Sequence, residues 1–467
     1  MNVCKKHMKF SDCELAILRN AVDKAEKIEG AKKIANPQIQ EIISIVESFL
    51  RKKKLICYGG TAINNILPVK DQFYDKNIEI PDYDFFSNNA LQDAKELADI
   101  YYNKGFEMVE AKAGSHYGTY KVFVNYIPVA DITQLVSELF KNIKKTAIKK
   151  YGIYYCPPNF LRMSMYLELS RPAGDVSRWE KVLKRLILLN DNYPLTNIKC
   201  AKIDYQRKWE LKKYDSKVVF DIIQETAVDL GLVFFGGYAN ILYSKYMPKN
   251  LREKIQKIPD FDLLSYDPLK SITIIKERLM DENIKNVKII KHKEVGEIVA
   301  KHYELTIDDE TCCFIYEPIA CHSYNVIHHN DQKINIASID TILSFYLAFI
   351  YTDRKYYDDT RLLCMADALF NVIMHNRLEQ KGILKRFTLN CYGKQHTLED
   401  IKIEKAEKYE ELKNKKNSKE YEEWFLKYIP GENNKKLKKR KTIKNKPKTD
   451  KSNKTIHKKD DLLNIEL

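Results

Sequence analysis

The chain carries the same pattern of segments twice, and this internal duplication constrains its fold more than any other feature. The matched segments are residues 55–62 with 232–239, 80–87 with 258–265, and 127–131 with 317–321. The first pair are apolar runs that end in Gly-Gly, and the second pair are identical at five of eight positions. Three matches in one order predict two copies of one α/β (α+β) domain.

The first copy has the pattern of alternating strands and helices. Residues 55–58 predict a strand, Gly59-Gly60 a tight turn, and a helix is expected to begin near Thr61. The other expected strands are residues 82–87, 106–110, 120–126 and 129–133. The other expected helical regions are residues 10–50, 89–102, 157–189 with a break at Arg171-Pro172, 339–375 and 405–428.

These elements divide the chain into five regions. Residues 1–45 are an N-terminal helical region, and residues 46–195 are the catalytic copy with its trailing helices. Residues 196–380 are a degenerate second copy with its helical region. Residues 381–430 are a charged helical segment, and residues 431–467 are a basic tail.

The positive charge is concentrated in the tail. Residues 435–459 contain 13 Lys or Arg and one acid, Asp450, so they carry +12 of the formal net charge of +15. Such a segment lacks apolar periodicity and predicts disorder. It would bind a nucleic-acid backbone through counterion release, or it would serve solubility or localisation.

Apolar runs and cysteines indicate the compartment. No stretch reaches the ~18–20 apolar residues of a membrane span, and the N-terminus lacks a secretory signal. Ten scattered cysteines without a Cys-x-x-Cys pair predict neither a disulfide framework nor a zinc-finger grid. We therefore expect a cytoplasmic protein, in the host cytoplasm or the virion if the chain is viral, with no membrane partner.

Three carboxylates of the first copy predict a metal site. Asp82 and Asp84 are two positions apart on one strand, so both side chains point to the same face. Asp131, at the end of a neighbouring strand, would supply a third ligand. A set of carboxylates without His or Cys favours Mg²⁺ or Mn²⁺, and a pair of such ions would activate a hydroxyl for in-line displacement.

The turn before these strands predicts a phosphate site. Gly59, Gly60 and Thr61 stand at a helix N-terminus, where backbone N–H groups and a hydroxyl can bind phosphate oxygens. Gly-Gly and Asp-x-Asp are each weak signals alone. The combination of apolar strand, Gly-Gly-Thr, helix, Asp-x-Asp and a later strand Asp resembles the DNA polymerase β-like nucleotidyltransferase superfamily.

A closer resemblance is to the poxvirus-type poly(A) polymerase catalytic subunit, in the form found in giant DNA viruses of the mimivirus kind. It covers about residues 40–370. The motifs that carry it are residues 57–62, 81–86, 129–132, 165–172 and 178–185. The resemblance implies template-independent addition of AMP from ATP to the 3′ end of mRNA. The resemblance is compatible with a homodimer and also with a separate processivity subunit.

The resemblance also implies roles for individual residues. Asp82 and Asp84 would bind both metal ions, and Asp131 would bind the ion that activates the RNA 3′-hydroxyl. Gly59, Gly60 and Thr61 would hold the ATP phosphates. The candidates for clamping the triphosphate are Arg171, Arg178, Lys181 and Lys184. The alternative for these four is a solvated basic helix face.

The second copy predicts a silent site. It keeps Asp260 and Asp262, but Tyr238 stands in place of Thr61 and Cys321 in place of Asp131. Without its third carboxylate, a two-ion site loses both charge and geometry. The metal motif does not choose the base, so a uridylyl- or CCA-adding enzyme stays open. A non-enzymatic RNA-binding scaffold is the other alternative, although three converging carboxylates are costly without a cation.

Overall fold

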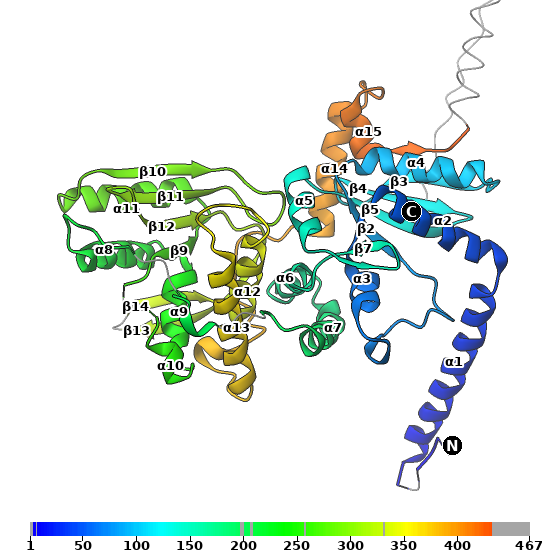
Figure 1. Cartoon of the computed structure of the whole chain (residues 1–467), viewed down its shortest axis with the longest axis horizontal. Helices are drawn as coiled ribbons and strands as arrows, with labels where there is room; N and C mark the ends of the chain where they lie inside the picture. Colours follow the sequence, from blue (N-terminus) through cyan, green and yellow to red (C-terminus); the bar gives the residue numbers. More distant parts are fainter. Residues whose placement is uncertain are drawn as a thin grey trace, which may run out of the picture.

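The computed structural model shows two α/β units joined by a layer of helices (Figure 1). It describes residues 3–5, 7–196, 200–205, 209–255, 258–329 and 332–431. The basic segment 435–459 lies outside these residues. Within the described residues, no helix combines the length and the apolar character that crossing a membrane requires.

The first unit is built on an eight-stranded sheet. Its strands are β1 (Ile56–Cys57), β2 (Tyr83–Ser87), β3 (Val109–Ala113), β4 (Thr119–Val124), β5 (Ile127–Gln134), β6 (Ile148–Lys150), β7 (Ile153–Tyr155) and β16 (Lys427–Tyr428). They are ordered β16-β3-β4-β5-β2-β1-β7-β6. Its helices are α1 (Phe10–Ile34), α2 (Pro37–Lys53), α3 (Gly59–Ile66), α4 (Ala90–Asn103) and α5 (Ser137–Lys145). Helices α2 and α4 pack on this sheet and against each other.

The second unit repeats this plan. Its strands are β8 (Val233–Phe235), β9 (Phe261–Leu264), β10 (Val287–His292), β11 (His302–Ile307), β12 (Glu310–Tyr316), β13 (His322–His329), β14 (Gln332–Ala337) and β15 (Cys391–Tyr392). Its helices are α8 (Ser216–Asp229), α9 (Gly236–Ser244), α10 (Lys249–Arg252) and α11 (Pro268–Asp281). The strand order is β10-β11-β12-β9-β8-β14-β13-β15. Its first seven strands follow the order of β3-β4-β5-β2-β1-β7-β6 in the first sheet, which confirms the predicted duplication.

Four helices join the two units. They are α6 (Pro158–Leu169), α7 (Trp179–Asn192), α12 (Ile339–Phe349) and α13 (Asp359–His375). Helix α6 follows β7, and α12 follows β14, so the duplication extends into this layer. Figure 1 shows these helices between the two sheets, where α6 packs against α12. The predicted break in residues 157–189 is confirmed, since α6 ends at Leu169 and α7 begins at Trp179.

Local sequence explains how the first unit begins. The side chain of Asn36 accepts a hydrogen bond from the backbone N–H of Gln38, and Pro37 occupies the first helical position of α2. The helix ends where Lys54 adopts a left-handed conformation with φ 55°. Its buried face includes Val46 and Leu50, at the spacing of one helical turn. This face anchors α2 on the sheet that holds the candidate site.

The C-terminal segment differs from the prediction of one charged helix over residues 405–428. The chain instead forms α14 (Leu398–Leu412), α15 (Lys419–Phe425) and then β16, which pairs antiparallel with β3. Ser418 caps α15 and separates it from α14. Residues that follow the second unit in sequence therefore complete the edge of the first sheet.

Candidate active site

Strand register brings two of the predicted carboxylates together. Asp84 is the second residue of β2, and it lies directly beside Asp131 on the parallel strand β5. Asp82 immediately precedes β2. The side chains of Asp84 and Asp131 are half-buried, and Asp82 is more exposed. The predicted neighbourhood of these carboxylates is therefore present at the centre of the sheet.

Burial and charge repulsion raise the pKa of two of these carboxyl groups. Burial, followed by the charges of Asp82 and Asp131, raises the pKa of Asp84 to about 7. Burial and the charge of Asp131 also raise the pKa of Asp82. Ionisation of Asp82 and Asp84 is therefore costly without a cation, which is the electrostatic condition for cation binding.

A lysine, which sequence reasoning did not single out, balances part of this charge. The Lys121 ammonium lies 2.5 Å from Oδ2 of Asp131, its direct partner across the β4–β5 ladder. The other oxygen of Asp131, Oδ1, is buried and receives no hydrogen bond from the described part of the chain. The donor chemistry therefore suits a hard divalent cation at Oδ1. As placed, no three His, Cys, Asp or Glu side chains in the described ranges are arranged as a metal site.

The Gly-Gly turn requires its glycines for steric reasons. Gly59 has φ +70°, and a Cβ there would lie 2.5 Å from Oδ2 of Asp84. A Cβ on Gly60 would lie 2.7 Å from the Tyr74 hydroxyl and 3.0 Å from both terminal nitrogens of Arg185. The turn therefore touches the carboxylate cluster on one side and a guanidinium on the other.

Thr61 has a structural contact that the sequence did not predict. Its hydroxyl donates a hydrogen bond of 2.6 Å to the backbone carbonyl of Asp82. This bond ties the first turn of α3 to the residue before β2. The N-terminus of α3 carries no side-chain cap, so its first N–H groups are available to an anion.

Arg185 is the basic residue that the fold places against the turn. Its guanidinium donates to the Tyr74 hydroxyl at 2.6 Å and lies 4.9 Å from the ring centroid of Phe73. The sequence contained a signal for it, since Arg178 and Arg185 are seven residues apart and share a helical face.

The four predicted clamp residues have different environments. Arg178 forms an ion pair with Glu168 at 3.1 Å, and its charge lowers the pKa of Asp84 against the larger opposing effects. Burial lowers the pKa of Arg171, whose Nε is buried with no hydrogen-bond partner in the described ranges. Lys184 pairs with Glu180 on the solvated face, and Lys181 is exposed. Of the four, Arg178 is the one whose charge acts on the carboxylate cluster.

The second unit lacks the third carboxylate, but the sequence alignment that assigned its replacement to Cys321 is wrong. Strand β12 pairs in parallel with β9, and the residue beside Asp262 is Phe314. Cys321 follows β12 and forms a disulfide with Cys391. The similarity between residues 127–131 and 317–321 was misleading because the first segment is a strand and the second lies beyond one.

The equivalent site in the second unit is also closed. The ring of Tyr238 packs against Phe220, Phe234 and Phe261, and its hydroxyl accepts a hydrogen bond from Gln224. Beside Asp260 and Asp262 remains a cavity of about 30 Å³. This volume suits a water molecule and excludes a nucleotide.

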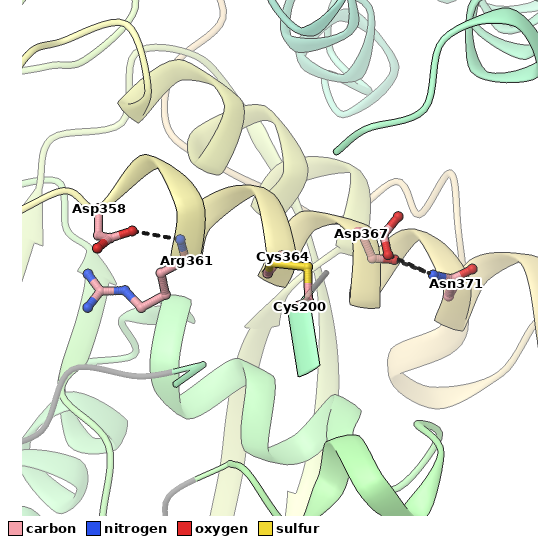
Figure 2. Close-up of a disulfide and its surroundings, with 6 residues drawn as sticks. All are labelled: Cys200, Asp358, Arg361, Cys364, Asp367 and Asn371. Carbon is pink, nitrogen blue, oxygen red and sulfur yellow. Dashed lines mark hydrogen bonds between the residues drawn. A yellow bond between two sulfur atoms is a disulfide. The ribbon is translucent and has the colours of Figure 1, made fainter. Parts of the chain in front are cut away.

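The cysteines, for which the sequence predicted no disulfide framework, form three disulfides. The bonded pairs are Cys4–Cys13, Cys200–Cys364 and Cys321–Cys391. Figure 2 shows that Cys364 lies on α13, whose first turn is capped by Asp358 through the backbone N–H of Arg361. Sequence spacing could not reveal the bonds at separations of 70 and 164 residues, because only the folded chain brings their partners together.

Comparisons with known proteins identify the same region. Residues 44–175 match the family described as poly(A) polymerase catalytic subunit. A putative poly(A) polymerase catalytic subunit of Acanthamoeba polyphaga mimivirus is 26% identical over 313 residues, which cover 62% of this chain and 53% of the relative. A protein of the same description from African swine fever virus (isolate Pig/Kenya/KEN-50/1950) is 33% identical over 193 residues, or 40% of each chain.

A solved structure matches almost the whole chain. The crystal structure of the Megavirus polyadenylate synthase superposes with a TM-score of 0.76 at 18% identity, covering 95% of this chain and 91% of that chain. This likeness confirms the predicted fold class. The chain spans about half or less of the length of the curated relatives it matches. Residues 44–175, which contain the carboxylate cluster and the Gly-Gly turn, match the poly(A) polymerase catalytic subunit family, and the resemblance predicted from the sequence is confirmed.

Proposed function

We propose that this chain is a poly(A) polymerase that transfers AMP from ATP to the 3′ end of RNA without a template. The observation that carries the proposal is the placement of Asp84 beside Asp131, with Asp82 and the Gly59-Gly60 turn adjoining them. This arrangement lies inside the region matched by the poly(A) polymerase catalytic subunit family.

The carboxylates are proposed as ligands of two divalent ions. Asp82 and Asp84 would hold both ions, and Asp131 would hold one, through the oxygen that Lys121 leaves free. Bound Mg²⁺ or Mn²⁺ supplies Lewis-acid activation of the RNA 3′-hydroxyl and neutralises charge on the departing pyrophosphate. Lys121 supports this role by pairing with the other oxygen of Asp131, which orients the carboxylate.

The turn and α7 are proposed to bind the triphosphate of ATP. The backbone N–H groups of Gly59 and Gly60 begin α3, where the helix dipole favours an anion. Arg185 lies against Gly60 with its guanidinium oriented by Tyr74, and Arg178 lies near enough to act on Asp84. Because its hydroxyl is engaged by Asp82, Thr61 would contribute through its backbone N–H.

The second unit is proposed to support RNA binding and packing without catalysing transfer. Phe314 stands where a third carboxylate is needed, and the cavity beside Asp262 is about 30 Å³. Clamping by Arg171, Lys181 and Lys184 stays a prediction. Association with a second copy or a processivity subunit, and a cytoplasmic location, also stay predictions.

Nucleotide addition to a short RNA tests the proposal. The protein would be incubated with a labelled RNA, Mg²⁺ or Mn²⁺, and each of the four nucleoside triphosphates separately. We expect extension with ATP to be fastest. Faster incorporation of UTP or CTP would make the chain a uridylyl- or CCA-type enzyme, and no extension with any nucleotide would favour the scaffold alternative.

A further inference from the structure

A basic groove lies on one side of the carboxylate cluster. It has a volume of about 270 Å³ and runs between the β3–β4 hairpin and α14. Four lysines line it, namely Lys112, Lys121, Lys402 and Lys405. Lys121 also contacts Asp131, so the groove adjoins the candidate active site.

The lysines face one another despite their like charge. Lys112 and Lys121 are direct partners across the β3–β4 ladder, an arrangement that destabilises a sheet when the charges are alike. Lys402 and Lys405 are three residues apart and share a face of α14. Lys405 donates a hydrogen bond of 2.8 Å to the backbone carbonyl of Gly114, which fixes α14 against the hairpin loop. The fold thus holds four cations around one groove.

The chain itself neutralises little of this charge. Lys121 pairs with Asp131, and Lys112 has Glu110 at 3.9 Å, at the limit of an ion pair. Within the described ranges, neither Lys402 nor Lys405 forms an ion pair. A cluster of cations that lacks matching acids suits a polyanion.

We propose that this groove holds the backbone phosphates of single-stranded RNA just upstream of its 3′ end. The order of strands distinguishes RNA from ATP as the ligand. The groove lies on the β3–β4 side of Asp131, whereas Gly60 follows the end of β1, on the other side of β2, and Arg185 lies against it. The RNA assignment rests on the proposed function, since it places the 3′-hydroxyl at Asp131.

An exposed tyrosine beside the groove, packed on a half-buried tryptophan, supports a single strand as the ligand. Tyr117, in the hairpin loop that Lys405 holds, is 52% exposed and its ring centroid lies 4.6 Å from that of Trp424 on α15. Unpaired bases of a single strand can stack on such rings. The bases of a duplex are paired and are not available for this stacking. Phosphate contacts from the lysines and base stacking on Tyr117 together define a strand-binding surface.

The test measures RNA affinity directly. A labelled oligoadenylate would be titrated with the full chain, without ATP or divalent metal, at several KCl concentrations. We expect the double variant Lys112→Glu, Lys402→Glu to lower the slope of log affinity against log salt by about 1.4, at about 0.7 for each lost phosphate contact. The control is Lys24→Glu, Lys27→Glu, which makes the same charge change at two exposed positions of α1. A slope equal to that of the control would overturn the proposal.

Steady-state kinetics separate the two substrates. In the Lys112→Glu, Lys402→Glu variant, the KM for the RNA should rise while the KM for ATP stays at the parental value. A raised KM for ATP with parental RNA affinity would assign the groove to the triphosphate and overturn the proposal. If the double variant does not fold, the surface change Lys402→Gln should still lower the salt slope by about 0.7. If the parent chain adds no nucleotide but the groove substitutions still lower its RNA affinity, the RNA-binding groove is supported and the polymerase function is refuted.

Discussion

Replacing Asp84 by Asn should stabilise the metal-free protein while abolishing nucleotide addition. The folded protein raises the pKa of this carboxyl from 3.8 to about 7, so the folded chain keeps a proton that the unfolded chain has lost. The stability of the parent therefore falls as the pH rises from about 4 to 7, and levels off above that range. Asn cannot ionise, so the free energy of unfolding of the Asp84→Asn variant should exceed that of the parent by an amount that grows over the same pH interval.

The size of the effect follows from the shift in acidity. A rise from 3.8 to about 7 corresponds to a ceiling of about 4 kcal/mol, at about 1.4 kcal/mol per pH unit. Protonation of Asp82 relieves part of this repulsion, because coupled carboxylates share their protons. We therefore expect about 2 kcal/mol at pH 8, which raises the Tm of a domain of ~150 residues by roughly 4–8 °C.

Thermal unfolding in EDTA from pH 4 to 8 measures this difference. The matched control is Asp23→Asn, which removes an exposed carboxylate on α1. A variant less stable than the parent, or an advantage that does not change between pH 4 and 8, would refute the electrostatic reasoning. Addition of Mg²⁺ should raise the Tm of the parent and leave that of Asp84→Asn almost unchanged.

Three further changes test the site from other directions. Asp131→Ala should lower nucleotide addition by several orders of magnitude, whereas Asp262→Ala should keep most of it; equal losses in gel-based extension assays, with both proteins folded, would make the second unit catalytic. Arg185→Ala should lower kcat/KM for ATP by roughly tenfold or more, since a charged hydrogen bond contributes about 1.5–3 kcal/mol; an unchanged value would remove Arg185 from the triphosphate site. Truncation after Gly431 should weaken RNA binding and reduce its salt dependence, as measured by anisotropy, while an unaltered salt slope would indicate another role for the basic segment.

The sequence predicted structure correctly wherever the pattern lay within a short segment of the chain. Apolar residues before Gly59, and the two-residue spacing of Asp82 and Asp84, correctly placed a strand, a turn and a second strand. Repetition of these signals predicted the second unit, which the matching strand order confirms. The proximity of Asp131 to Asp84 also followed, because Asp131 was expected on a strand next to that of Asp84, and β2 and β5 are paired.

Contacts between segments far apart in the chain could not be predicted from the sequence. Arg185 meets Gly60 only because α7 packs beside α6 in the helical layer, and the sequence of neither segment shows that the two come together. Phe314 replaces the third carboxylate through strand register, which a five-residue alignment cannot determine. The two-residue strand β16 is too short to show a period, so its pairing with β3 was invisible as well.

The return of β16 to the first sheet has a consequence for biosynthesis. A ribosome releases most strands of the first unit early, but the strand that covers β3 comes just over three hundred residues of chain after Val124. Until then, β3 is an open edge that can pair with another nascent chain. The groove wall formed by α14 arrives equally late, so the strand-binding surface matures only when nearly the whole polypeptide has been made. A fragment limited to residues 44–175 would therefore carry the carboxylates but have neither a protected sheet edge nor a complete RNA path.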